Sequence, residues 1–266
     1  MWPLKPKPVV DADAAAWHVE NFAWLARQFG HSRGLGAIEL VLPRPGYFTV
    51  DGEQGHALAE RIFAQVSAYC LMSDWDVELI ADDNPLARHD TVGLGTAQKY
   101  ALGSFGSDGR RIQITYVPAL LRRPEQLIAT FAHELAHYLL AAAEYPICAE
   151  DERECLTDLT AVFMGFGVFL ANARFSHEAY DDGMRQGWRI GHSGYLPERD
   201  LVYALALFLR AKQLGADEAC ACLKPHLARL LRRAMQQLPD DHDHVAQIRA
   251  AMAEAEAAVG ALDRTG

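Results

Sequence analysis

The chain has 266 residues, of which half are hydrophobic and 23% are charged, an ordinary composition for a globular protein of one large or two small domains. Its formal net charge of −10 argues weakly against a nucleic-acid-binding role. Basic residues do pair locally, and we interpret each pair as a solvated edge rather than a phosphate site. The pairs are Arg110-Arg111, Arg122-Arg123 and Arg232-Arg233.

Neither a signal peptide nor a membrane span is visible in the sequence. The first eight residues lack the apolar stretch of a signal peptide. The longest apolar run, residues 159–173, is too short to cross a bilayer comfortably and is typical of a buried core helix. The five cysteines include no CxxC pair, which favours reduced thiols. We therefore expect a cytoplasmic protein that does not associate with a membrane.

The first half of the chain mixes helical and strand patterns. Asp11 or Asp13 can cap a helix that runs to about Gln28 and that Gly30 ends. Apolar residues at helical spacing predict a second helix within residues 51–72. Short apolar or alternating runs predict strands at residues 37–42, 75–80 and 111–117, with a loop at 82–103.

The second half is predicted to be helical. Pro124 and Glu125 suit the first turn of a helix over residues 124–143. A helix over residues 150–173 is apolar nearly all round and should be buried. Its Gly165 and Gly167 indicate either close packing against another backbone or a local kink. Residues 174–194 are polar and Gly-rich, and three further helices are expected at 198–214, 220–237 and 244–262.

Residues 129–138 contain the pattern His133-Glu134-x-x-His137 within a helix-favouring run. On a helix the two histidines stand one turn apart and point the same way. Two imidazoles on one face can share a Zn²⁺ ion at about 2.0–2.1 Å each. Glu134 lies about 100° round the helix from His133. That position suits a carboxylate that contacts a metal-bound water as general base rather than the metal itself.

A hydrolytic zinc site needs a third protein ligand and an open position for water. Sixteen residues separate His137 from Glu154, enough to end the first helix, turn at Pro146 and begin an antiparallel second helix. Glu154 and Asp158 would then lie one turn apart on one face. Glu154 can supply the third ligand, and Asp158 can accept the outer N–H of a zinc-bound histidine. Glu152 and Asp151 are alternative ligands, but Glu152 lacks an aspartate four residues on and Asp151 is nearer the turn.

The sequence His-Glu-x-x-His followed by Glu-x-x-x-Asp on the next helix resembles the gluzincin group of zinc metallopeptidases, the thermolysin-like and related families. The likeness covers about residues 111–173, and residues 111–117 resemble the edge strand along which such enzymes bind an extended substrate. It implies a zinc-dependent hydrolase that acts on peptide or protein substrates. By position it implies zinc ligation by His133, His137 and Glu154, the base role for Glu134 and support of a ligand by Asp158.

The chain also departs from that family. The spacing to Glu154 is shorter than in the thermolysin-like enzymes, so the loop 144–150 must be tight. A metzincin-type third histidine is missing, since residue 143 is alanine. The family's downstream histidine or tyrosine, which stabilises the transition state, has several candidates here. These are Tyr180, His192, Tyr195 and Tyr203, of which Tyr195 and His192 are favoured because they sit in a polar, Gly-rich loop.

Other interpretations remain open at this stage. The two histidines alone could be half-buried residues of an amphipathic helix. Cys148, if it bound as a thiolate, would favour a closed structural zinc site, whereas Cys155 is expected in the core. The tract Asp240-Asp241-His242-Asp243-His244 resembles a metal-binding run, but we expect it to cap the final helix.

The predicted fold class is α+β: a small mixed α/β N-terminal part, a zincin-like two-helix active-site core and a helical C-terminal third. A soft domain boundary would separate residues 1–175 from residues 176–266. Two functions fit, a zinc metallopeptidase and a non-catalytic, zinc-stabilised binding or regulatory protein. Glu134 favours the enzyme, because a non-catalytic zinc site has no need of a carboxylate there.

Overall fold

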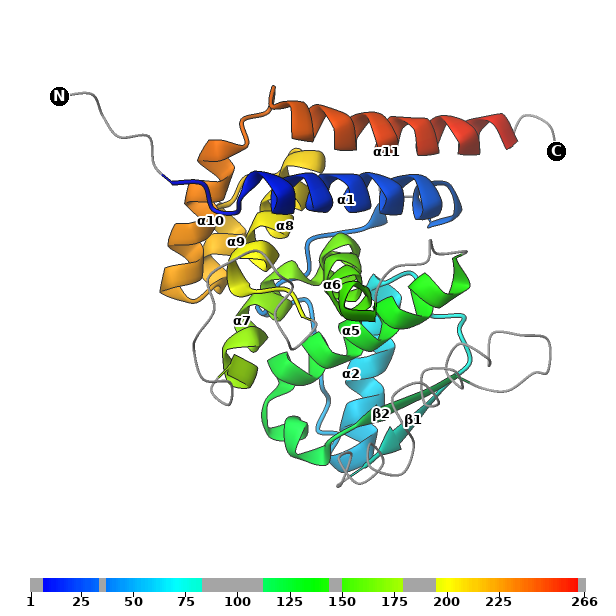
Figure 1. Ribbon diagram of the computed structural model, residues 1–266. Helices are drawn as coiled ribbons and strands as arrows, with labels where there is room; N and C mark the ends of the chain where they lie inside the picture. Colours follow the sequence, from blue (N-terminus) through cyan, green and yellow to red (C-terminus); the bar gives the residue numbers. More distant parts are fainter. Residues whose placement is uncertain (1–6, 34–36, 83–111, 144–149, 179–194, 263–266) are drawn as a thin grey trace. The chain divides into compact units, whose positions relative to one another are not determined.

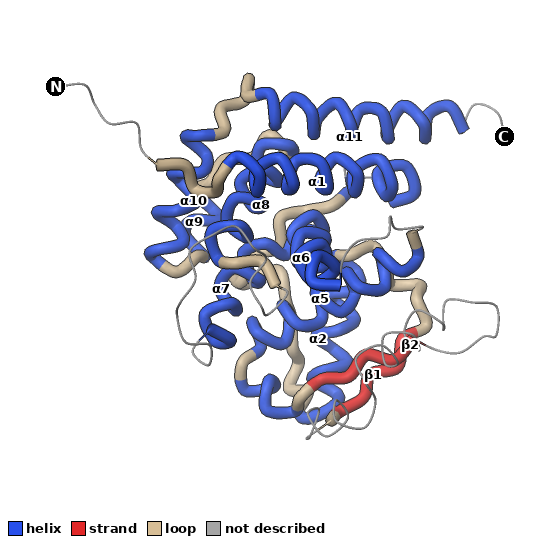
Figure 2. Tube along the Cα trace, in the orientation of Figure 1, coloured by secondary structure: helices blue, strands red, loops and turns tan. Residues whose placement is uncertain are grey.

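The computed structural model describes residues 7–33, 37–82, 112–143, 150–178 and 195–262. These residues are mostly helical, with one small parallel sheet (Figures 1 and 2). The helix-rich mixed class expected from the sequence is confirmed at this level. The helices are α1 (Ala12–Arg33), α2 (Gly55–Tyr69), α5 (Pro124–Ala142), α6 (Glu150–Ala161), α7 (Gly167–Glu178), α8 (Glu198–Ala211), α9 (Asp217–Cys222), α10 (Pro225–Gln237) and α11 (Asp243–Leu262), with short turns η2 (Pro118–Arg122) and η3 (Val162–Phe166).

The chain divides into two compact units. Residues 43–147 form one, which we call the sheet unit, and residues 1–42 with 148–266 form the other, the helical unit. The N-terminal residues belong to the helical unit because α1 packs lengthwise against α11 (Figure 1). The division therefore does not fall near residues 175–196, where composition alone suggested a soft boundary. Local composition carries no information about the pairing of the first and last helices.

In the sheet unit, β1 (Val77–Ala81) pairs in parallel with β2 (Ile112–Tyr116), with Val77 opposite Ile112. Both strands lie where the alternation of apolar and polar residues predicted them, at residues 75–80 and 111–117. Helix α5 packs against α2 and β2. The Phe131 ring of α5 meets Phe63 and Tyr116 edge-on, with ring centroids 5.3 and 5.9 Å away. The loop expected at residues 82–103 lies almost wholly outside the described residues.

Helix α5 is also tied to β2 by a polar contact. The buried Tyr138 hydroxyl donates a hydrogen bond of 2.6 Å to the backbone carbonyl of Gln113. Burial raises the pKa of Tyr138 well above its ordinary value, and the nearby charge of Glu134 raises it further. The phenol therefore stays protonated and keeps donating. This hydrogen bond thus ties Tyr138, the residue after His137, to β2.

Tyr138→Phe is expected to lower the free energy of unfolding by about 1–2 kcal/mol, because the Gln113 carbonyl loses its donor. Urea denaturation followed by circular dichroism measures this. Tyr47→Phe is the matched control, since the Tyr47 hydroxyl makes no hydrogen bond to the described residues. Equal stability of the two variants would contradict a stabilising role for the Tyr138 bond.

The helix predicted at residues 150–173 is realised in three pieces, α6, the wider turn η3 and α7. Gly165 interrupts it with a φ of +94°, a conformation that residues with a Cβ avoid. The buried extended segment 38–42 passes alongside, and the Val41 amide donates to the Gly165 carbonyl at 3.0 Å. Both sequence interpretations of Gly165 therefore hold: the helix kinks, and another backbone packs there.

The strand predicted at residues 37–42 is wrong. The segment is extended, but within the described residues no strand pairs with it. Most of its apolar side chains are buried in the helical unit instead. The Val41 amide donates its hydrogen bond to the Gly165 carbonyl of η3 rather than to a strand. An apolar run reports burial and does not specify a neighbouring strand.

Two helix boundaries also differ from expectation. Asp11 caps α1 by accepting the Ala14 amide at 2.9 Å, as predicted. The helix then runs past Gly30 to Arg33, because tertiary packing outweighs the cost of about 1 kcal/mol for an internal glycine. The helix predicted at 220–237 is split into α9 and α10, since Pro225 forces the preceding Lys224 out of helical geometry.

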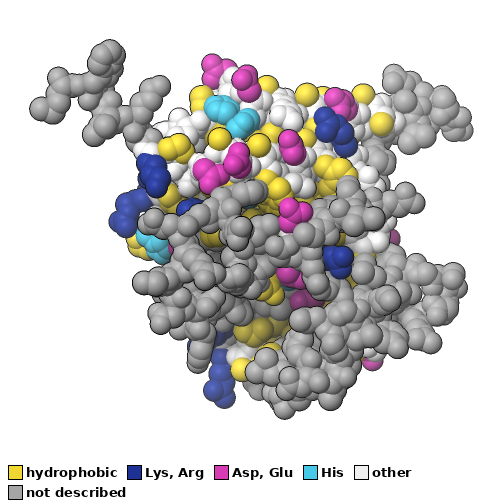
Figure 3. All heavy atoms as spheres, viewed as in Figure 1, with side chains coloured by type: hydrophobic (Ala, Val, Ile, Leu, Met, Phe, Trp, Pro, Cys, Tyr) yellow, Lys and Arg dark blue, Asp and Glu magenta, His cyan; other side chains and the backbone are white. Residues whose placement is uncertain are grey.

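Among the described residues, one helical run, Glu152–Ala173, is long and apolar enough to cross a membrane. Nearly all of it is buried inside the protein, as in a core helix. Elsewhere in the helical unit, α10 packs its apolar face on α8 and exposes Arg229 and Arg232. Lys and Arg side chains gather over this part of the surface, at the left of Figure 3.

Candidate metal centre

Helix α5 presents two histidines on the same side. His133 and His137 are both half-buried, and their ring centroids lie 4.7 Å apart with the ring planes nearly perpendicular. The opposite side of the helix fills the core of the sheet unit through Leu127, Phe131 and Leu135. Burial of that apolar side leaves the histidines on the more accessible one, as the helical spacing predicted.

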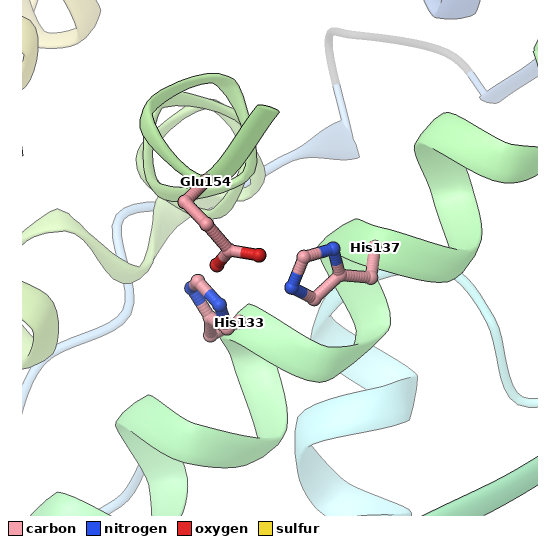
Figure 4. A group of neighbouring side chains, drawn as sticks. All are labelled: His133, His137 and Glu154. Atoms are coloured by element: carbon pink, nitrogen blue, oxygen red, sulfur yellow. The ribbon is translucent and has the colours of Figure 1, made fainter. Parts of the chain in front are cut away.

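The structure brings Glu154 of α6 to these histidines. His133, His137 and Glu154 each offer one ligand atom, and these atoms all lie within 4.8 Å of one another. Figure 4 shows the Glu154 carboxylate pointing toward the two imidazole rings. In the described part of the chain, no other group of three His, Cys, Asp or Glu side chains gathers in this way.

The donor set suits a metal ion. Two imidazole nitrogens and one carboxylate oxygen are ligands that zinc accepts, and three protein ligands leave a fourth position for water. Tetrahedral ligands at 2.0–2.1 Å from a metal are about 3.4 Å apart, so small side-chain rotations would bring these atoms into range. The three residues could therefore hold a metal ion.

The other ligands weighed from the sequence do not join this group. Glu152 lies on α6 but is not one of the gathered residues. Cys155 is buried, as expected of a core residue. Cys148 and the side chain of Asp151 lie outside the described residues.

Glu134 follows His133 on α5 and is half-buried. It is not one of the three gathered ligands. Its negative charge contributes to the raised pKa of Tyr138, one turn further along.

Asp158 lies one turn after Glu154 on α6 and is only 5% exposed. Its Oδ2 accepts a hydrogen bond of 2.9 Å from the backbone amide of Leu196. The hydrogen bond from Asp158 to a metal-binding histidine stays a prediction. Sequence reasoning missed the contact with Leu196, because no local pattern links two residues that are 38 positions apart.

The residues suggested from the sequence as stabilisers of a transition state differ in their exposure and contacts. Tyr195 is 37% exposed and precedes the residue held by Asp158. Tyr203 is buried in the helical unit, where its hydroxyl lies 3.1 Å from Nδ1 of His244. His192 and Tyr180 lie outside the described residues. The Tyr203 hydroxyl therefore already has a hydrogen-bond partner inside the helical unit. Of Tyr195 and Tyr203, Tyr195 is the exposed one.

Burial raises the pKa of Tyr203 to about 12. An unfolded tyrosine loses its proton near pH 10, so the folded state binds more protons than the unfolded state between about pH 10 and pH 12. The contribution is constant below about pH 10 and is lost as the pH rises through that window. Relative to Tyr203→Phe, the wild type should lose about 2 kcal/mol of unfolding free energy between about pH 9 and pH 12. Urea titrations across this range measure it, and a difference that stays constant with pH would contradict it.

The acidic tract before α11 is explained by local structure. Asp240 pairs with Arg210 at 3.0 Å and with Arg249 at 2.7 Å. Nδ1 of His242 accepts the His244 amide at 3.2 Å. A histidine rather than an aspartate therefore caps the first turn, which corrects the residue expected in that role.

The structure is a helix-rich protein with a His-His-Glu group able to hold a metal ion. A further carboxylate, Glu134, lies on α5, the helix that carries the two histidines. No family model matches the chain, and neither a curated protein nor a solved structure is similar to it. Its function is therefore inferred from the residues of the site.

Proposed function

We propose that the chain is a zinc-dependent metallopeptidase with a gluzincin-like core. The observation that carries the proposal is the gathering of the His133, His137 and Glu154 ligand atoms within 4.8 Å. Glu134 adds a carboxylate directly after the first ligand. A hydrolytic zinc centre requires this combination of three ligands and a neighbouring base.

Each residue has a definite role in this chemistry. A zinc ion held by His133, His137 and Glu154 would supply a water of lowered pKa and polarise the peptide carbonyl of the substrate. Glu134 accepts the proton of the attacking water and delivers it to the leaving amine. Its place outside the ligand group leaves its carboxylate able to do both.

A non-catalytic zinc protein is the competing function, and it would need the three ligands but not Glu134. The experiment measures zinc per purified chain and cleavage of casein and a peptide library, with and without a chelator. About one zinc per chain with chelator-sensitive cleavage supports the peptidase. Bound zinc without any cleavage supports the non-catalytic protein, and failure to bind zinc after reconstitution rejects both.

Ligand variants sharpen the test. Glu154→Gln is expected to weaken zinc binding strongly, because a neutral amide replaces a ligating carboxylate. Glu152→Gln is the matched control on the same helix, since Glu152 is outside the gathered group. Equal zinc affinity of the two variants would remove Glu154 from the ligand set.

A further inference from the structure

Helix α10 concentrates positive charge on an acidic protein. Residues 223–238 include one lysine, three arginines and no Asp or Glu, although the chain has 35 acidic residues and a net charge of −10. The apolar side of α10, which includes Leu227 and Leu231, is buried, and α10 packs on α8. Arg229 and Arg232 are exposed, and Arg233 is half-buried. The exposed side of α10 is therefore basic, as the left of Figure 3 shows.

The three arginines lie together on one side of the helix. Residues three or four apart on a helix are neighbours, so Arg232 and Arg233 both lie beside Arg229, and we call the three the arginine face. The sequence interpretation of Arg232-Arg233 as a solvated edge left Arg229 out of account. Like charges at these spacings repel each other. The arginine face therefore needs a source of negative charge or costs the free protein stability.

The described residues offer no such source. None of their carboxylates forms an ion pair with an arginine of this face. The last turn of α10 holds no basic residue, so attraction to the negative end of the helix does not account for the cluster either. The uncompensated charge indicates a negatively charged partner.

The N-terminal segment lies along the same helix. The Gln237 side chain donates to the Lys7 carbonyl at 3.2 Å and accepts the Val9 amide at 2.9 Å. One terminal nitrogen of Arg233 donates to the Pro8 carbonyl at 3.4 Å. The Arg233 Nε has no hydrogen-bond partner among the described residues. This segment therefore holds Arg233 at the edge of the arginine face, and it brings the exposed Lys7 to the C-terminal half of α10.

The chemistry of the surface selects among negatively charged partners. An arginine guanidinium is a planar fork that binds a carboxylate or a phosphate with two hydrogen bonds. Stable attachment to a membrane also needs apolar side chains that enter the lipid, and within the described residues α10 exposes no large hydrophobic side chain. A nucleic acid is disfavoured by the net charge of −10. A short acidic segment of a protein fits best, because its charge is confined to the carboxylates that meet the arginines.

The spacing of the arginines suits an extended segment. Arg229 and Arg233 are four residues apart, about 6 Å along the helix. In an extended peptide, alternate side chains point the same way and are about 6.6 Å apart. Two acidic residues separated by one other residue can therefore each meet one of these arginines. We propose that the arginine face of α10 docks a protein through an extended segment of alternating Asp or Glu residues. This surface shares no residue with the candidate metal group.

Fluorescence anisotropy tests the proposal on the purified full chain. The probe is a labelled peptide of alternating glutamate and serine, and its control has glutamine in place of each glutamate. The wild type should bind only the glutamate peptide, and more weakly as salt is added. Replacing both Arg229 and Arg232 by glutamine should weaken binding at least about tenfold, because two charge-assisted contacts are lost. Both side chains are exposed, so the helix content should not change. Addition of a chelator should leave binding unchanged, which separates this test from that of the peptidase.

Replacing both Arg122 and Arg123 by glutamine is the matched control. It removes the same charge from two exposed arginines at the end of η2 and should leave the affinity for the glutamate peptide unchanged. Equal weakening by the two double variants would overturn the proposal, because net charge alone would then decide binding. No binding of the glutamate peptide to the wild type would also overturn it. So would tighter binding of anionic lipid vesicles or of a single-stranded oligonucleotide that is lost in the α10 variant, since the face would then serve that partner.

Discussion

Replacing Glu134 with glutamine is expected to lower kcat for peptide cleavage by about 10²–10⁴-fold, the usual contribution of a general base. Glutamine has nearly the same shape but cannot accept a proton from water. Because Glu134 is outside the gathered ligands, zinc content and stability should change little. Initial rates over a range of substrate concentrations, with zinc measured on the same preparation, provide the test.

The matched control is Glu125→Gln, the same change in the exposed first turn of the same helix. It should leave kcat unchanged. Glu134→Gln that retains zinc and cleaves within tenfold of the wild-type rate would contradict the base assignment. Loss of zinc from Glu134→Gln would instead show that this carboxylate supports the metal.

Gly165→Ala is expected to destabilise the protein by about 3–5 kcal/mol, from the strain of a left-handed backbone and from steric overlap. The φ of Gly165 is +94°, and a Cβ there would lie 2.0 Å from the carbonyl oxygen of Glu39. That oxygen belongs to the backbone and cannot rotate away. The segment 38–42 would have to shift, and the Val41 hydrogen bond to the Gly165 carbonyl would weaken. Chemical denaturation measures the loss.

Gly167→Ala is the natural comparison. Gly167 has a helical φ of −57°, and the atoms nearest to an added Cβ would belong to the side chains of Leu205 and Val162, at 3.1 Å each. The gain in helix propensity of up to about 1 kcal/mol offsets the tight fit, so we expect little net change. A loss in Gly165→Ala no larger than that in Gly167→Ala would show that the segment 38–42 yields easily.

Local patterns were sufficient for much of the site. The His-x-x-x-His spacing placed two imidazoles on one side of α5, because the helical repeat fixes directions within one turn. The same reasoning placed Glu154 and Asp158 one turn apart on α6. The strands at residues 75–80 and 111–117 could be predicted from alternation, but not their parallel pairing or register. Alternation shows which side of a strand is buried and leaves its neighbour unspecified.

The sequence by itself determined the two histidines of the candidate metal group, the helix that carries Glu134 and the helix-rich class. Only the tertiary structure decided that Glu154 rather than Glu152 gathers with the histidines, that Asp158 accepts the Leu196 amide, and that the segment 38–42 packs on Gly165 instead of in a sheet. It also decided that α1 joins α11 in the helical unit. The physical reason is range: periodicity is set by neighbours within a turn or two, whereas these contacts depend on where distant segments meet when apolar surface is buried.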